Sequence, residues 1–327
     1  MAIKFIIQAG RERLESNGGL VLGGKILAGL DLDRRVNGII IDGALEPKIT
    51  NADVLRSYCG LLIMGRTNYE DIELFRHDGY FRRALVIKRV PSSVTLRQRL
   101  DGAEGRFDEI LKEANGGLLN AAALTPVKTE RGEYLPVDVD VSPFDNSKSQ
   151  KEGTGRTYKG TDGYAPNFAY VGAEGYMLNC ELRPGTQHCQ KGTQEFLRET
   201  FELLGKVKTE YPVLLRMDSG NDAAANVRQC RAEGRAYIIK RNLRKESLDD
   251  WLGMAKIYGV ATHPRPGKTV YIGACYRFMK DGAGNFEPWR IVFEVTVRTI
   301  TAKGEQLLIQ RLRRIHIGRV WKNIPEQ

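Results

Sequence analysis

The alternation of apolar and polar positions divides the chain into a first part with helical spacing and a second part dominated by strands. Up to about residue 125, apolar residues recur at the spacing of amphipathic helices, and short turns separate them. Three helices follow from this spacing, at residues 51–64, 69–76 and 94–100. Ser92 or Ser93 is the expected N-cap of the third. The stretch from Gly116 to Arg131 breaks the pattern and predicts a connection between domains.

Residues 126–240 have the pattern of a mixed α/β sheet. The predicted elements alternate in the order three strands, helix, strand, helix, strand, at residues 134–141, 167–172, 176–182, 193–204, 213–217, 222–233 and 236–240. The second and third strands are separated by a short turn and form a predicted hairpin. Acidic residues stand at strand ends, and we expect them to face one edge of this sheet.

After residue 240 the pattern changes again. Residues 241–268 are polar and are expected to be irregular, while residues 269–279 and 289–300 alternate as two long strands. The turn between them begins at Asp281. This predicts an all-β insertion in the α/β core, at residues 241–309.

Three aspartates at strand ends are the main candidates for chemistry. Asp138 and Asp140 lie two residues apart near the end of one predicted strand and therefore point to the same face. Asp218 ends the apolar run at residues 212–217, of which Arg216 is the charged member, and a Ser-Gly turn follows it. Because clustered carboxylates are costly without a positive partner, their convergence predicts a divalent cation, with Mg²⁺ or Mn²⁺ as the candidates. The alternative for Asp138 and Asp140 is a solvent-facing pair on an edge strand.

Composition narrows the class of protein. The chain has 327 residues, of which 42% are hydrophobic, and this length allows two or three domains. No apolar run approaches the roughly eighteen residues of a membrane span, so we expect a cytoplasmic protein without a membrane partner. Five cysteines without Cys-x-x-Cys spacing argue against a disulfide framework and a zinc module. The net charge of +10 favours a polyanionic partner such as DNA.

Polar and basic residues in two regions are candidate DNA contacts. The predicted helix at residues 94–100 and its short neighbours are typical of a helix-turn-helix-like unit, in which the start of the second helix reaches base edges. The candidates there are Ser93, Thr95, Arg97, Gln98 and Arg99. A small helical bundle with a solvated basic face remains the alternative. In the second region, Arg183 and Lys240 near strand ends are either phosphate contacts or surface side chains that extend their charge into water. His188 either contacts DNA or a leaving group, or is a hydrogen-bonded loop histidine.

Several of these segments together resemble bacterial insertion-sequence transposases of the DDE class, whose catalytic core has an RNase-H-like fold. The resemblance extends over nearly the whole chain and includes the Thr-Leu-Arg-Gln-Arg-Leu run and the Asp-Ser-Gly end of a strand. The matching segments are residues 18–20, 60–62, 65–67, 71–73, 90–93, 95–101, 137–140, 163–166, 182–185 with His188, and 214–220.

The resemblance implies a fold, a reaction and a set of partners. The fold would be an RNase-H-like mixed sheet with a β insertion, preceded by a helical DNA-binding region at residues 1–125. Asp140 matches the first family aspartate, with Asp138 as the second choice, and Asp218 matches the second. The implied reaction is metal-dependent hydrolysis of a phosphodiester at the element end, followed by strand transfer into target DNA. The implied partner is double-stranded DNA in the nucleoid.

The family's third acid, a glutamate on a helix after the β insertion, has no evident match. Glu294 and Glu305 are the nearest glutamates and neither matches the motif. The tail at residues 310–327 has five basic residues and a single acid, which is atypical of the family and suggests a truncated or frame-shifted chain. We therefore expect an incomplete active site. The alternative function is an inactive DNA-binding remnant that inhibits transposition by occupying element ends or by pairing with the full-length enzyme; a homodimer is also expected.

Overall fold

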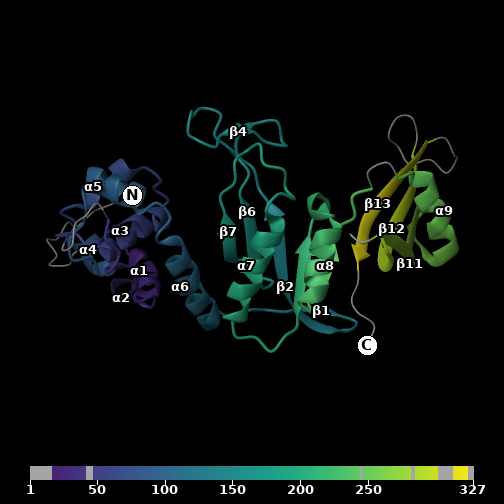
Figure 1. Ribbon diagram of the computed structural model, residues 1–327, viewed down its shortest axis with the longest axis horizontal. Coiled ribbons are helices and arrows are strands. Elements are labelled where there is room, and N and C mark those ends of the chain that lie inside the picture. Colours follow the sequence, from purple (N-terminus) through teal and green to yellow (C-terminus); the bar gives the residue numbers. More distant parts are fainter. Residues whose placement is uncertain (1–16, 42–46, 244–245, 281–283, 301–311, 323–327) are drawn as a thin grey trace, which may run out of the picture. The chain divides into compact units, whose positions relative to one another are not determined.

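The computed structural model describes residues 17–41, 47–243, 246–280, 284–300 and 312–322 (Figure 1). The chain divides into two compact units, Met1–Ala121 and Ala122–Gln327. Among the described residues, no helix is long and apolar enough to cross a membrane.

The described part of the first unit is helical. Its elements are α1 (Leu20–Ala28), α2 (Leu32–Val36), α3 (Asn51–Ile63), the 3₁₀ helix η1 (Tyr69–Phe75), α4 (Gly79–Ala84), α5 (Ser93–Ala103) and α6 (Asp108–Ala121). Apolar faces of α1, α3, α4 and α5 meet in one core, which includes Leu61, Phe81 and Leu96. Ser92 is the N-cap of α5, where its side chain accepts a hydrogen bond from the Thr95 amide. The helices predicted around residues 51–64 and 94–100 are confirmed, and the one at 69–76 is a 3₁₀ helix.

The predicted break at Gly116 is wrong. Helix α6 continues through both glycines to Ala121. Each glycine costs a helix roughly 1 kcal/mol relative to alanine. Burial of Ala114, Gly116 and Leu119 offsets this cost, because tertiary packing outweighs local helix propensity.

The second unit is built on a mixed sheet. Its strands are β1 (Val127–Thr129), β2 (Gly132–Val141), β6 (Asn167–Val171), β7 (Tyr176–Glu181), β8 (Val213–Met217) and β9 (Ala236–Ile239). The order is β7-β6-β2-β8-β9, with β1 paired to β2. Strands β7, β6 and β2 are antiparallel neighbours, whereas β2, β8 and β9 run parallel. The predicted strands of residues 134–240 are thus confirmed.

Two helices cross over between the parallel strands. α7 (Thr193–Gly205) and α8 (Ala224–Ala232) lie side by side against the sheet (Figure 1), and Gln229 of α8 donates a hydrogen bond to the Gln194 carbonyl of α7. α7 buries Leu197, Phe201 and Leu204, which are four and three residues apart and therefore share one helix face. These crossovers bring the carboxyl ends of β2, β8 and β9 to one edge of the sheet.

A small three-stranded sheet interrupts the connection from β2 to β6. It contains β3 (Phe144–Asp145), β4 (Gly155–Arg156) and β5 (Asp162–Tyr164). Glycines allow its backbone to pack closely: a Cβ at Gly163 would lie 1.8 Å from the Phe144 carbonyl oxygen, and one at Gly185 would lie 2.1 Å from the Gly163 carbonyl oxygen. Only glycine fits at these positions. The small sheet and the 184–186 segment therefore form one closely packed piece.

The last described part is a second sheet with a helix. It contains α9 (Leu248–Tyr258) and β10 (Gly259–Arg265), β11 (Lys268–Lys280), β12 (Phe286–Ile300) and β13 (Leu312–Lys322), paired antiparallel in this order. The two long predicted strands are confirmed. The expectation that residues 241–268 are irregular and that the insertion is all-β is wrong, because Ser247 caps a helix that buries Trp251, Leu252 and Ala255.

Two further sequence expectations fall in this region. Residues 312–322 of the predicted atypical tail form β13, which pairs with β12. Glu294 lies within β12. Glu305 and the turn residues 281–283 lie outside the described residues.

Candidate active site

Asp140 and Asp218 are neighbours at the carboxyl edge of the mixed sheet. β2 and β8 are parallel, and their register pairs Val139 with Met217. The next residue on each strand is an aspartate, so the two carboxylates extend from adjacent strands, which lie about 5 Å apart. Residues paired across parallel strands point to the same face. The predicted convergence of these two acids therefore has a direct cause in the register.

Backbone and side-chain donors hold the Asp218 carboxylate. Asp218 precedes the short 3₁₀ helix η2 (Ser219–Asn221), and its Oδ1 accepts hydrogen bonds from the Gly220 amide at 3.0 Å and from Asn221 Nδ2 at 3.2 Å. Asn221 is buried, and its carbonyl accepts a hydrogen bond from Asn226 of α8. The carboxylate is thus oriented by the turn that follows its strand.

Ionisation of the Asp140 carboxyl group is unfavourable in the folded protein. Burial raises its pKa above the ordinary value, and the neighbouring Asp218 raises it further. The Tyr158 hydroxyl stands close by and donates a hydrogen bond to the Val141 carbonyl. Burial, followed by the charges of Asp140 and Asp218, raises the pKa of Tyr158 as well. A cation at this edge would relieve the repulsion between the two carboxylates.

Asp138, the second choice for the first acid, makes a different contact. Both of its carboxylate oxygens accept hydrogen bonds from Arg216, from Nε and Nη2, each at 2.5 Å. Arg216 stands opposite Asp138 in the β2–β8 register. A bidentate pair with a guanidinium neutralises the carboxylate, so Asp138 is engaged by the neighbouring strand. The lone arginine in the apolar 213–217 strand was the sequence signal for this partner.

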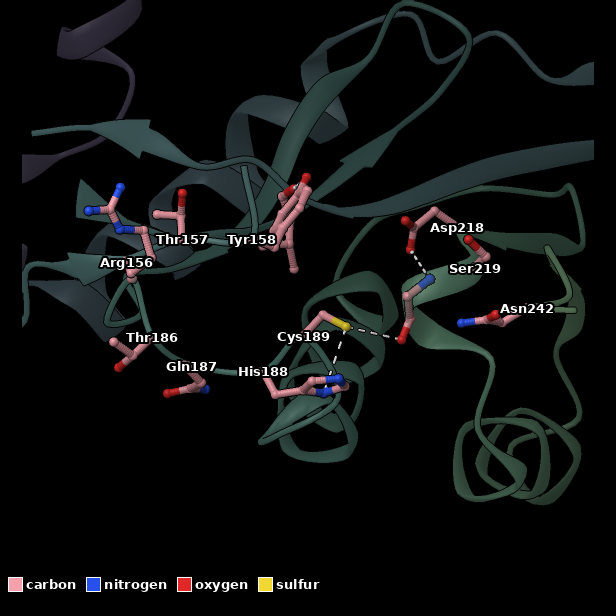
Figure 2. A pocket seen from close by; sticks show the side chains of 13 residues that line it. Arg156, Thr157, Tyr158, Thr186, Gln187, His188, Cys189, Asp218, Ser219 and Asn242 are labelled. Atoms are coloured by element: carbon pink, nitrogen blue, oxygen red, sulfur yellow. Dashed lines mark hydrogen bonds between the residues drawn. The ribbon is translucent and has the colours of Figure 1, made fainter. Parts of the chain in front are cut away.

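A cavity of about 450 Å³ opens beside Asp218 (Figure 2). Tyr158 and its neighbours form one wall, residues 185–189 form another, and Asp218–Gly220 form a third. The first wall belongs to the chain segment between β2 and β6, and the sequence pattern did not indicate that this segment lies near the acids. Residues that line the cavity include Arg156, Thr157, His188, Cys189 and Asn242.

His188 lies in the wall of this cavity. Its Nδ1 accepts a hydrogen bond from the Gln190 amide at 3.2 Å, which leaves the Nε2 atom of a neutral imidazole as a donor. Cys189 Sγ donates to the Gly220 carbonyl at 3.1 Å, and burial together with Asp218 raises the pKa of this thiol. The thiol therefore connects the 185–189 segment to the turn after Asp218. His188 is thus hydrogen-bonded in its loop and borders the cavity, and its contact with DNA stays a prediction.

Two predicted DNA contacts are buried and make contacts within the protein. Arg183 is 1% exposed, pairs with Glu181, donates to the Cys189 carbonyl and stacks on the Phe196 ring. Arg99 is 8% exposed and donates to the Ile49 carbonyl. These contacts give both arginines a structural role, and their contact with DNA stays a prediction.

The remaining predicted contacts lie nearer the surface. On α5, Arg97 and Gln98 are exposed, and Arg97 pairs with Glu70. Ser93 and Thr95 are half-buried in the first turn of this helix. In the second unit, Lys240 is exposed directly after β9, and its amide donates to the Met217 carbonyl.

A buried ion-pair network joins the Asp218 turn to the second sheet. Asp222 ends this turn and lies 3.9 Å from Nη1 of Arg241, and its carboxylate also accepts from the Asn242 amide. Arg241 in turn pairs with Glu246. Glu246 also accepts a hydrogen bond from Trp251 of α9 and pairs with Arg277 of β11. These ion pairs therefore link the turn after Asp218 to α9 and β11.

The donor set fits a hard divalent cation in part. Asp140 and Asp218 supply two adjacent carboxylates, which Mg²⁺ accepts when water completes its shell. Within the described ranges, no group of three or more His, Cys, Asp or Glu side chains is arranged to hold a metal ion.

Sheet order, crossover helices and paired acids at the carboxyl edge define the class: an RNase-H-like core of the DDE type. The sequence matches the family model "Transposase DDE domain group 1" over residues 5–250, and the chain belongs to this family. No curated protein matches the sequence. Among solved structures, the piggyBac transposase in a synaptic complex with hairpin DNA is similar, with 13% sequence identity and a TM-score of 0.42. That match covers 94% of this chain and 61% of the piggyBac chain, so this chain spans less than two thirds of the length of that protein.

Proposed function

We propose that this chain acts on DNA as a transposase and that Asp140 and Asp218 bind the divalent metal of its active site. The observation that carries the proposal is their adjacent placement on parallel strands β2 and β8, within a family of DDE transposase domains. The raised pKa of Asp140 adds support, because a carboxyl group whose charge is unfavourable in the free protein gains most from a bound cation.

The residues around Asp140 and Asp218 would orient the carboxylates and contact the DNA phosphate. A bound Mg²⁺ or Mn²⁺ would activate the attacking hydroxyl and stabilise charge on the phosphate. Gly220 and Asn221 keep Asp218 aimed at the site, and the Arg216 pair keeps Asp138 from competing for the cation. His188 Nε2 is available to donate a hydrogen bond to a phosphate oxygen, and Lys240 is a second candidate phosphate contact at the same sheet edge.

The helical unit would supply DNA binding outside the active site. α5 exposes Arg97 and Gln98, and its first turn carries Ser93 and Thr95, which is the arrangement expected of a helix that reaches base edges. The net charge of +10 favours binding to the phosphate backbone. We propose element ends and target DNA as the partners, bound by a homodimer.

A specific observation favours the second candidate function, a DNA-binding protein that does not cut. Two carboxylates, without a third acid grouped with them in the described part of the chain, form an incomplete DDE set. Such a site would hold a metal weakly. The chain would then occupy element ends, alone or paired with a full-length transposase, and inhibit transposition.

Cleavage of a supercoiled plasmid that carries candidate element ends tests both functions. The wild-type chain, Asp140→Asn, Asp218→Asn and the control Glu133→Gln are compared with Mg²⁺, Mn²⁺ or EDTA, and DNA binding is measured in parallel. Glu133 is an exposed acid at the other end of β2. Metal-dependent cutting by the wild type and the control, lost in both aspartate variants, supports the transposase. Salt-sensitive binding without cutting supports the inhibitor, and absence of both overturns the proposal.

A further inference from the structure

Tyr158 has features that the carboxylate pair does not explain. The residue is 70% exposed, although it stands in the wall of the cavity beside Asp218 (Figure 2). A large ring left in water at the rim of a site forgoes the free energy of burial. Residues 156–159 around it include two further cations, and the Lys159 ammonium lies 5.9 Å from the centre of the Tyr158 ring.

The ring is held in one orientation. Its hydroxyl donates a hydrogen bond to the Val141 carbonyl at 3.2 Å, one residue after Asp140. The hydroxyl end of the ring therefore lies next to the strand end that carries Asp140, on a cavity that Asp218 also lines. An aromatic side chain has only two rotatable bonds, so one anchored end leaves little conformational freedom to lose on binding.

The wall that carries Tyr158 and the wall that carries His188 form one closely packed piece. The backbone of residues 155 and 163 lies so close to Gly185 that a Cβ there would be 2.2 Å and 2.1 Å from their carbonyl oxygens. Tyr164 and Pro184 also form an isolated β-bridge between the two segments. The width of the cavity is therefore set by backbone contacts, and its volume of about 450 Å³ lies within the usual range for small-ligand sites.

We propose that this cavity is a nucleotide subsite in which a DNA base stacks on the Tyr158 ring while the adjoining phosphate lies toward Asp140 and Asp218. Stacking on an aromatic face tolerates any base, and nearby cations hold the backbone. The Lys159 ammonium lies over the ring, 5.9 Å from its centre, and Arg156 stands on the same wall of the cavity, although Arg156 also pairs with Asp162. The acids alone would repel DNA, so the stacking surface and these cations supply the attraction that the site needs. This inference rests on the proposed action on DNA and adds the nucleotide whose base the site accommodates.

A fluorescence experiment tests the subsite directly. The probe is a short oligothymidylate that carries one 2-aminopurine base, whose emission is quenched when it stacks on an aromatic ring. Binding is measured with Ca²⁺ for the wild-type chain and for Tyr158→Ala, Tyr158→Leu and Tyr158→Phe. Tyr176→Ala is the matched control, because Tyr176 is also an exposed tyrosine on the mixed sheet but stands at the opposite end of β7 from the acids.

We expect quenching by the wild type and by Tyr158→Phe, which keeps the ring. The affinity of Tyr158→Ala and Tyr158→Leu should fall by about 5- to 150-fold, which corresponds to the loss of one stacked base. Retained quenching and affinity in both of these variants, or an equal loss in Tyr176→Ala, would overturn the subsite. Circular dichroism confirms that each variant is folded, and Tyr158→Leu keeps the apolar bulk if the alanine variant does not fold.

The result separates the subsite from the proposed function. Ring-dependent quenching in a chain that does not cut plasmid DNA in any metal supports the subsite and removes the transposase activity. Plasmid cutting that is the same in Tyr158→Ala and Tyr176→Ala, with no ring-dependent quenching, removes the subsite alone.

Discussion

Replacement of Asp140 by asparagine should stabilise the metal-free protein. The change keeps the shape of the side chain and removes one of two neighbouring negative charges. Because burial and Asp218 raise the pKa of Asp140, its ionisation at neutral pH weakens the folded state. Asparagine has no charge to desolvate at this position, so the unfavourable contribution disappears.

The magnitude follows from the spacing of the strands. Two unit charges about 5 Å apart repel by about 3 kcal/mol at an effective dielectric of 20 and by slightly under 1 kcal/mol in water. Asp140 and Asp218 are both exposed residues, so the repulsion energy in water applies. About 1 kcal/mol corresponds to a rise in melting temperature of roughly 2–4 °C for a unit of this size.

A bound metal should cancel the stability advantage of Asp140→Asn. A cation that binds the folded state with a dissociation constant of about 1 mM adds about 1.4 kcal/mol at about 10 mM metal. Wild type should gain this stability, and Asp140→Asn should gain little because one ligand is lost. The variant is therefore the more stable protein in EDTA, and its advantage should disappear in Mg²⁺.

Thermal unfolding followed by tryptophan fluorescence measures the effect. All three tryptophans, Trp251, Trp289 and Trp321, lie in the second unit, so their emission reports on the unit that contains the acids. The raised pKa of Asp140 gives the sign of the pH dependence. The difference between wild type and variant should be largest near neutrality and should vanish at acidic pH, where Asp140 is protonated in both the folded and the unfolded chain.

Two results would refute this reasoning. One is a lower melting temperature of Asp140→Asn in EDTA at neutral pH, which would mean that the charge is stabilising. The other is an equal Mg²⁺-induced shift in wild type, Asp140→Asn and the control Glu133→Gln, which would place the metal elsewhere.

Further predictions test the supports of the site and the assignment of the arginines. Arg241→Ala breaks buried ion pairs and should destabilise the second unit by about 3–5 kcal/mol in urea unfolding, whereas Arg198→Ala, which loses exposed pairs on α7, should cost under about 1 kcal/mol. Gly163→Ala should lower both the melting temperature and 2-aminopurine quenching, because its Cβ meets a backbone oxygen; unchanged values would contradict the close packing of the two walls. Arg97→Ala should weaken DNA binding and reduce its salt dependence by about one phosphate contact without loss of stability. Arg99→Ala should instead lower the stability of the first unit, and a pure binding defect in this variant would restore it as a DNA contact.

Much of the sheet could be predicted because its signals are local. The apolar run before Asp218 and the short turn between β6 and β7 identify strands without reference to the rest of the chain. Helix α9 was not predicted, although Ser247 is a typical N-cap and Trp251 begins an apolar helix face. The polar residues on either side of this helix made the whole segment resemble a loop. The glycines of α6 led to the wrong prediction of a helix break. Burial of residues of this helix outweighed the low helix propensity of glycine.

Which acids end strands can be predicted from the amino-acid sequence, because the apolar and polar periods of a strand are properties of a few consecutive residues. Which acids meet depends on how the strands pair in the folded chain. The β2–β8 register places Asp218 beside Asp140 and Arg216 beside Asp138, and a register is set by long-range pairing. The same holds for Tyr158, which reaches the acids because glycines let the small sheet pack against residues 184–186. Contacts between residues far apart in sequence leave no periodic pattern, and so they appear only when the chain is folded.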